Sequence, residues 1–257
     1  MTGKTLSMCL FISLLCFSHP LASGSRELLA SVGNIVPHSV LDENGVPQGG
    51  FVEIVRAIDR VYTEGTISIR VYPIERSMAK LKNGDADFQI PYISNPKVPE
   101  RNLDYTFVSE PITDVVFVLY TRSESTLSPE DDLEKRDIET LRGAENHFSF
   151  KISGVDSFRQ GLLRASLGRS DGFIAEQDAC DLYIRDHKIE NLRRTFFAKW
   201  KSSIAILKGP RGREIDDILS TAMRKLKQSG ELQKITSAIH LPYYEDWQPF
   251  LTDWESR

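Results

Sequence analysis

The stretch MAKLKNGDADF at residues 78–88 decides the fold, because it joins a helix end, a glycine and the start of a strand. Glycine readily takes the left-handed backbone that ends a helix, and Asp87, three residues after that glycine, opens a short apolar segment. A second copy, LLRASLGRSDGF, occupies residues 162–173 and places Asp171 three residues after Gly168. Two such helix-to-strand units, one in each half, predict two α/β lobes with a ligand cleft between them.

Composition and charge are those of an ordinary globular protein. The chain has 257 residues, of which 40% are hydrophobic and 26% are charged. Its formal net charge is -4 at pH 7, so the sequence offers no electrostatic footprint for a nucleic-acid partner.

Residues 1–24 have the order of a secretory signal peptide. Lys4 supplies a basic start, residues 6–17 form an apolar run that is short for a bilayer span, and small residues follow at 22–24. Cleavage removes two of the three cysteines and leaves Cys180 as a lone packing residue, so no intramolecular disulfide can form. We expect a periplasmic protein that is a monomer.

Hydrophobic periodicity predicts strands that alternate with helices, which favours parallel sheets with helical crossovers. The expected strands are 28–32, 67–71, 86–90, 115–120 and 203–207, and the expected helices are 51–62, 74–83 and 215–239, the last broken at Gly230.

The uninterrupted apolar strands 115–120 and 203–207 bracket the second helix-to-strand unit. We expect them to carry the chain out of the first lobe and back, which makes them a natural hinge. Lobe one is then predicted at 25–114 plus 208–257, and lobe two at 115–207. Residues 148–152 are the expected opening strand of lobe two, and the segment 246–249 is expected to pack against lobe one.

Catalytic and metal-binding signatures are missing from the sequence. The histidines at 38, 147, 187 and 240 are far apart and lack the spacing of metal ligands. Neither a phosphate-binding glycine loop nor a Gly-x-Ser-x-Gly elbow occurs. We therefore expect no enzyme, no metal site and no cofactor.

The order of these features resembles the solute-binding proteins of family 3, the periplasmic receptors for polar amino acids in bacterial ABC importers. The resemblance extends over about residues 28–239 and implies a two-lobed fold of the periplasmic-binding-protein type II, with the second lobe inserted in the first. It is carried by GVPQGGF at 45–51, the two Gly-x-x-Asp units, Glu-Arg at 100–101 with FVSEP at 107–111, and KQSGEL at 227–232.

The same resemblance implies two ligand-binding residues. In the amino-acid receptors the arginine of the Glu-Arg motif grips the α-carboxylate of the ligand, and it corresponds to Arg101. An acidic residue five positions after the second-lobe aspartate receives the α-ammonium, and it corresponds to Glu176. Losing Arg101 is then expected to weaken binding by about 3 kcal/mol or more. The alternatives are an exposed or structural salt bridge for Arg101 and a solvated carboxylate for Glu176.

Four further residues are candidates for the cleft. Tyr92 and Ser94 leave a predicted strand where open α/β sheets place ligands, although a turn-stabilising role is equally open. Arg76 lies in the first turn of its helix, where a cation is poorly placed in the helix dipole. His38 lies in the loop after the first strand, and a surface position is its alternative.

These features predict an extracytoplasmic protein that captures a small polar solute, an amino acid or a related carboxylate, for an ABC permease. Two alternatives stay open at this point. One is a carboxylate dehydratase-like enzyme on the same scaffold, with Glu176 as its acid–base group. The other is a ligand-sensing receptor without a transporter.

Overall fold

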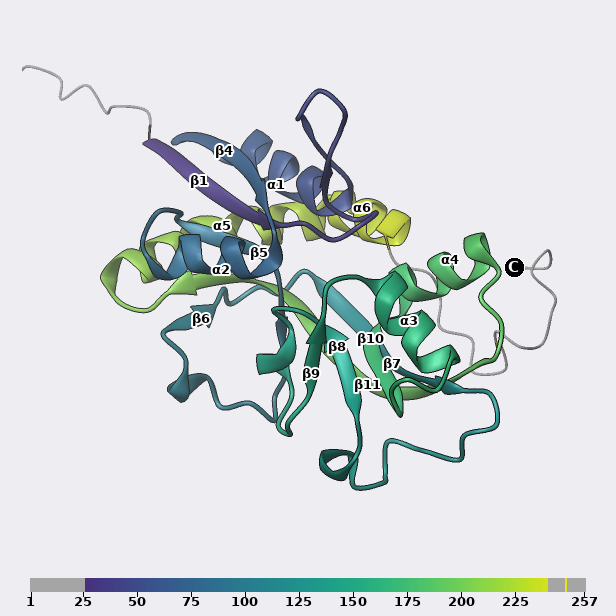
Figure 1. The fold of residues 1–257 in the computed structure, drawn as a ribbon. Coiled ribbons are helices and arrows are strands. Elements are labelled where there is room, and N and C mark those ends of the chain that lie inside the picture. The colour runs from purple at the N-terminus through teal and green to yellow at the C-terminus, as the bar shows by residue number, and fades with distance from the viewer. Residues whose placement is uncertain (1–25, 240–247, 249–257) are drawn as a thin grey trace, which may run out of the picture.

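The computed structural model describes residues 26–239 and Gln248, and the chain forms two lobes joined by one β-sheet (Figure 1). The predicted signal segment 1–24 lies outside the described residues, as do His240 and every residue of the segment 246–249 except Gln248. Within the described part of the chain, no helix combines the length and apolarity needed to cross a membrane.

Lobe one is a parallel sheet with helices on both faces. Strand β1 pairs in parallel with β4 and β5, as the alternation of strands and helices predicts. Alternate residues of β1 face a core shared with α1, α5 and α6, whereas Ser31 faces α2 and hydrogen-bonds Ser77. The elements of this lobe are β1 (Arg26–Gly33), the hairpin β2 (Val40–Leu41) and β3 (Pro47–Gln48), α1 (Gly50–Val61), β4 (Gly65–Tyr72), α2 (Ile74–Lys82), β5 (Phe88–Ser94), α5 (Pro210–Gln228) and α6 (Glu231–Ile239).

Lobe two repeats this wiring on a smaller scale. Strand β8 pairs in parallel with β9 and β10, and β10 pairs antiparallel with β7. Helix α3 lies close to β10, because a Cβ on Gly161 would stand 2.4 Å from the ring of Phe173. Cys180 is fully buried in the same core, as predicted. The elements are β7 (Thr113–Arg122), η2 (Leu133–Lys135), β8 (Ile138–Leu141), η3 (Glu145–His147), β9 (Ser153–Val155), α3 (Phe158–Ser166), β10 (Gly172–Glu176) and α4 (Gln177–His187).

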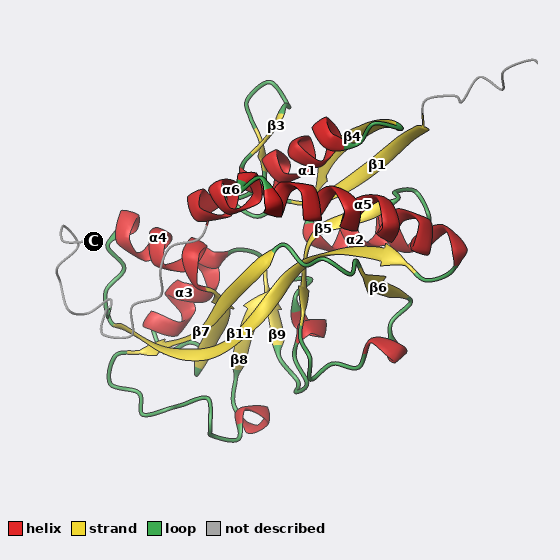
Figure 2. Ribbon diagram, turned by 180° about the vertical axis from the view of Figure 1, so that it is seen from behind, coloured by secondary structure: helices red, strands yellow, loops and turns green. Residues whose placement is uncertain are grey.

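The long strand β11 (Leu192–Leu207) joins the lobes into one nine-stranded sheet. Its first part pairs with β7, and its last part pairs with β5 and with β6 (Tyr105–Phe107). Figure 2 shows β7 and β11 crossing from one lobe to the other. The strands predicted at 115–120 and 203–207 are therefore present and link the lobes. The lobe boundaries themselves stay a prediction, because β11 belongs to both.

Both Gly-x-x-Asp units have the same local structure. Gly84 and Gly168 end their helices with φ angles of +74° and +63°, in the left-handed region. Asp87 then accepts a hydrogen bond from the backbone N–H of Leu29 at 2.8 Å and donates its own N–H to the carbonyl of Leu29. Asp171 makes the same pair of bonds with the backbone of Asp137, which precedes β8. Each aspartate thus ties the start of one strand to its parallel neighbour.

One expectation about lobe two was wrong. Residues 148–152 do not form a strand, and the parallel strands of the lobe begin with β8, for which the sequence gives no strand signal. Short strands such as β8 have too few residues to reveal a periodicity. The expected packing of the segment 246–249 on lobe one falls, apart from Gln248, outside the described residues. The side-chain amide of Gln248 exchanges two hydrogen bonds of 3.0 Å with the backbone of Arg194 on β11.

Candidate functional site

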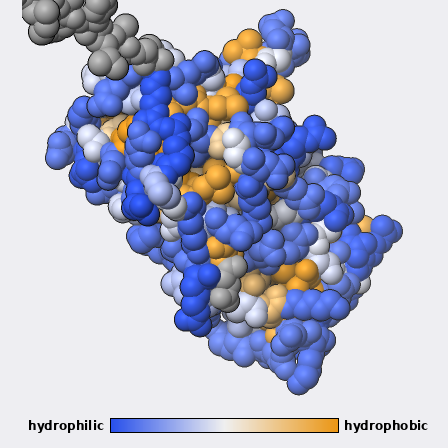
Figure 3. All heavy atoms as spheres, turned by 90° about the vertical axis from the view of Figure 1, so that its left-hand side faces the viewer, coloured by the Kyte–Doolittle hydropathy of each residue, from blue (hydrophilic) through white to orange (hydrophobic). Residues whose placement is uncertain are grey.

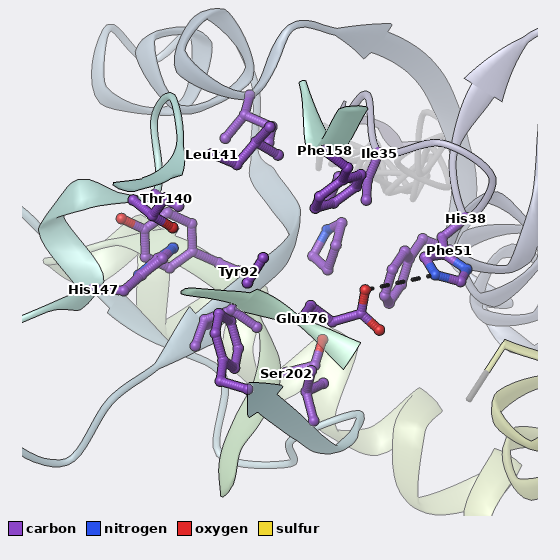
Figure 4. Close-up of a pocket in the computed structure, with 17 residues that line it drawn as sticks. Ile35, His38, Phe51, Tyr92, Thr140, Leu141, His147, Phe158, Glu176 and Ser202 are labelled. Carbon is purple, nitrogen blue, oxygen red and sulfur yellow. Dashed lines mark ion pairs between the residues drawn. The ribbon is translucent and has the colours of Figure 1, made fainter. Parts of the chain in front are cut away.

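A pocket of about 700 Å³, its opening to solvent included, lies where the two lobes meet (Figure 4). Apolar side chains gather along the middle of a mainly hydrophilic face in Figure 3. The pocket wall is mostly aromatic and aliphatic and comes from both lobes and from the strands that join them. It consists of Ile35, His38, Phe51, Ile74, Pro91, Tyr92, Ile93, Val115, Phe117, Thr140, Leu141, Ala144, His147, Phe158, Ala175, Glu176 and Ser202.

The glycine turn before α1 brings His38 and Phe51 into this wall. Gly49 has a φ angle of +105°, and a Cβ there would lie 2.4 Å from the carbonyl oxygen of His38. The same oxygen accepts the N–H of Phe51 at 3.1 Å. The rings of His38 and Phe51 lie edge to face, with their centroids 6.2 Å apart. Only glycine permits this approach, so the turn motif positions two pocket residues.

Glu176 ends β10 and caps α4 at the floor of the pocket. Its carboxylate accepts the backbone N–H groups of Asp178 and Ala179 at 2.8 and 3.1 Å. One carboxylate oxygen lies 3.8 Å from Nε2 of His38, across the lobe interface (Figure 4). Burial raises the pKa of Glu176, the Asp178 carboxyl acts in the same direction, and the two N–H groups oppose both.

Tyr92 and His147 form an aromatic wall on the other side of the pocket. Their rings lie edge to face, with centroids 4.5 Å apart. The Tyr92 hydroxyl accepts a hydrogen bond of 2.8 Å from the Tyr105 hydroxyl. Burial lowers the pKa of His147 to about 4, so its ring is neutral at neutral pH. Burial also raises the pKa of Tyr92, whose hydroxyl therefore stays protonated.

Contacts between the lobes hold the pocket in a closed form. The side-chain amide of Asn95, after β5, donates to the carbonyl of His147 at 2.6 Å. Gly143 of lobe two lies against the start of α2, where a Cβ would stand 3.0 Å from Cγ of Glu75 and 3.1 Å from Cγ2 of Ile74. With the His38–Glu176 pair, these contacts join the two lobes beside the pocket.

Three of the six residues predicted for ligand binding line the pocket, namely His38, Tyr92 and Glu176. His38 is buried, not on the surface. Arg101 lies exposed on η1 (Glu100–Asn102), Arg76 is exposed on α2, and Ser94 is half-buried at the end of β5, and none of these three lines the pocket. Their roles in ligand binding stay predictions.

Most of the pocket's aromatic residues were not predicted from the sequence. Phe51 comes after the glycine turn and Phe158 begins α3, so their positions beside helix starts were a usable signal. Phe117 and Ser202 had no such signal, because only the pairing of β7 with β11 brings their strands together. His147 was considered only as a metal ligand. Among the described residues, no group of three His, Cys, Asp or Glu side chains could hold a metal ion.

The family model of the bacterial extracellular solute-binding proteins, family 3, matches residues 29–239. A search of curated proteins gave no match. Solved structures give many matches, among them periplasmic binding proteins with the same two-lobed fold.

A histidine kinase sensor domain with similarity to periplasmic binding proteins matches with a TM-score of 0.69 and 21% identity, covering 84% of this chain and 96% of the other. A mutant of the ArgBP protein from T. maritima matches with a TM-score of 0.64 and 19% identity, covering 83% and 94%. The arginine-, lysine-, histidine-binding protein ArtJ from Geobacillus stearothermophilus matches with a TM-score of 0.64 and 16% identity, covering 83% and 95%.

Proposed function

The chain belongs to the bacterial extracellular solute-binding proteins of family 3, and from this premise we propose that it captures a small solute in the pocket between its lobes. The predicted signal segment 1–24 supports export to the periplasm. The single observation that carries the proposal is the pocket wall, which combines residues of lobe one, lobe two and the connecting strands. Such a wall is complete only when the lobes are closed.

Closure is the step that ligand binding would drive. A ligand that touches Phe51 on one lobe and Glu176 on the other gains contacts in the closed form that the open form cannot offer. This difference in affinity shifts the population toward the closed form. The Asn95–His147 hydrogen bond would form in the same step.

A pair of tryptophan variants tests the pocket. Ala175 is buried in the pocket wall on β10, whereas Ala79 is exposed on α2 and outside the pocket. Freshly purified wild-type protein and both variants would be analysed by native mass spectrometry for a co-purified small molecule. We expect the ligand in wild type and Ala79→Trp and not in Ala175→Trp. A ligand retained by Ala175→Trp would overturn the proposed site.

Uptake through an ABC permease is the first candidate for the role of the bound form, as for the amino-acid ABC transporter proteins among the similar structures. Ligand sensing is the second, and the similarity to a histidine kinase sensor domain favours it. A deletion strain separates the two. Loss of radiolabelled ligand uptake would indicate transport, and normal uptake with a lost transcriptional response would indicate sensing.

Binding without turnover completes the proposal. One similar structure is an ancestral amino-acid-binding protein described as a precursor of cyclohexadienyl dehydratase, which keeps the enzyme alternative in view. Glu176 is the carboxyl group in the pocket wall, but the described wall contains no Lys or Arg to hold a carboxylate substrate. Assays for dehydration of cyclic carboxylates should show no product. Light scattering during size exclusion should show the expected monomer.

A further inference from the structure

We infer that the pocket selects a small primary amine on an aromatic or compact apolar body and rejects ligands that carry a carboxylate. This selectivity rests on the proposed function, since it names the class of solute for the same site. It departs from the amino-acid ligand that the sequence led us to expect.

The charge of the wall disfavours a carboxylate. Glu176 is its carboxyl group, and the described residues that line it include no Lys and no Arg. Arg101 and Arg76, the cations predicted to reach the cleft, are exposed outside the wall. His147 adds no positive charge at neutral pH, because burial lowers its pKa to about 4. The ring of His38 lies 3.8 Å from the Glu176 carboxylate, so a zwitterionic amino acid would bury its carboxylate in a wall that holds another carboxyl group and no Lys or Arg, which is strongly unfavourable.

Helix starts could replace a cation, since their backbone N–H groups bind anions. Four helices begin beside the pocket. Side chains cap α3 and α4, and at the start of α1 the carbonyl of His38 accepts the N–H of Phe51 at 3.1 Å. Glu176 itself occupies the start of α4 with its carboxylate. Ser157 caps α3 by accepting the N–H of Gln160 at 3.2 Å. Gly143 packs on the start of α2, because a Cβ added to it would lie 3.3 Å from the backbone nitrogen of Glu75.

The wall suits an ammonium group instead. A carboxylate has about four acceptor positions, so Glu176 can receive a ligand ammonium while it keeps the two N–H groups of α4. An ammonium beside it also favours the ionised carboxylate and opposes the rise in pKa that burial causes. The rings of Phe51, Phe117 and Phe158 can then cover an apolar body and stabilise the cation through their faces.

Four compounds that share a phenylethyl body test the inference by calorimetry on the full mature chain. They are phenethylamine, phenethyl alcohol, hydrocinnamate and phenylalanine, which differ in carrying an ammonium, a hydroxyl, a carboxylate or both charges. We expect phenethylamine to bind at least about tenfold more tightly than hydrocinnamate and phenylalanine, because each of these buries an unpaired carboxylate. Comparable or tighter binding of either carboxylate overturns the inference, as does failure of phenethylamine to bind at millimolar concentration.

A matched pair of variants assigns the preference to Glu176. Glu176→Gln keeps an oxygen that can cap α4 but removes the charge, and Glu190→Gln makes the same change at an exposed residue away from the pocket. Glu176→Gln should lose about tenfold in phenethylamine affinity and change phenethyl alcohol affinity by less than about twofold. Glu190→Gln should change neither. Circular dichroism confirms folding, and an unchanged amine affinity in folded Glu176→Gln overturns the inference.

The outcomes separate the amine preference from the proposed function. A co-purified carboxylate that Ala175→Trp expels would leave the proposed function standing and overturn the amine preference. A co-purified ligand that Ala175→Trp retains would remove the pocket from consideration, and the amine preference with it.

Discussion

The two Gly-x-x-Asp units are alike where they build the sheet and different where they meet the ligand pocket. Asp87 and Asp171 each exchange two hydrogen bonds with the backbone of the neighbouring parallel strand or the residue before it. The strands that begin after them both run to the pocket. There β5 presents the neutral ring of Tyr92, whereas β10 presents the carboxylate of Glu176. The repeated motif therefore provides the scaffold, and chemistry varies at the far ends of the strands.

Substituting the two aspartates tests how much each Gly-x-x-Asp unit stabilises its lobe. Asp87 is half-buried and also pairs with Arg211 at 2.6 Å, whereas Asp171 is exposed and has the backbone bond to Asp137. We expect Asp87→Ala to lower the free energy of unfolding by about 2 kcal/mol and Asp171→Ala by about 1 kcal/mol. Urea denaturation of both variants measures this. Equal losses would show that the Arg211 contact contributes nothing.

The lobes also differ in the segment that joins their first two parallel strands, β1 and β4 in lobe one and β8 and β9 in lobe two. Lobe one places the 12-residue helix α1 there, and lobe two places the three-residue turn η3, which carries His147 into the pocket. Burial lowers the pKa of His147 from 6.5 to about 4, so the unfolded chain binds the extra proton between these values. Stability from the neutral ring is therefore present above pH 6.5 and is lost as the pH falls toward 4.

His147→Gln measures that loss, because glutamine does not titrate. The unfolding free energy of wild type relative to the variant should fall by about 2 kcal/mol between pH 7 and pH 5. The comparison cancels other titrating groups, such as Asp181, whose pKa burial raises to about 7. Thermal or urea unfolding of both proteins at the two pH values gives the difference. A constant difference would place a protonated His147 in the folded protein at pH 5.

Removing the polar groups of Glu176 and Tyr92 compares how much the pocket ends of β10 and β5 contribute to stability. Glu176→Ala removes the cap of α4 and should cost about 1 to 2 kcal/mol of unfolding free energy. Tyr92→Phe removes one acceptor and leaves the Tyr105 hydroxyl without that bond, for a loss of about 1 kcal/mol. Guanidinium titrations of both variants show which substitution lowers the unfolding free energy more. The reverse order would mean that the pocket carboxylate is strained in the ligand-free protein.

Arg101→Ala should have the smallest effect, because its side chain is exposed and outside the pocket wall. Ligand affinity should change by less than about 0.5 kcal/mol, as for a surface substitution. Calorimetry with the co-purified ligand checks this. A loss of about 3 kcal/mol would instead support the carboxylate-binding role that the family resemblance implies, and would require a rearranged cleft.

Local signals in the sequence were sufficient for most of the scaffold. The apolar face of α1 and the glycines that end α2 and α3 predicted those helices, and the long apolar run predicted β7. The local signals failed at β8, because its four residues are too few to show a strand periodicity. The two-lobed α/β fold and the family were predicted correctly.

The pocket was harder to predict, because its wall depends on contacts between distant segments. Glu176 was found through its spacing of five residues from Asp171, which the family resemblance supplied. Phe117 and Ser202 required the pairing of β7 with β11, which a pattern of single residues does not contain. Arg101 comes after a loop with three prolines, and no periodicity there specifies which way its side chain points.

The continuous sheet has a mechanical consequence. Strand β11 changes register twice, between Phe196 and Ala198 and between Ser203 and Ala205, on either side of the passage between the lobes. Such irregularities let a strand bend while its neighbours stay paired. We therefore expect the lobes to separate by bending along β11 and not by rotation about a single point. On this expectation, the binding of a solute has to supply the energy that bends the strands, while the pairing between β7 and β11 is kept.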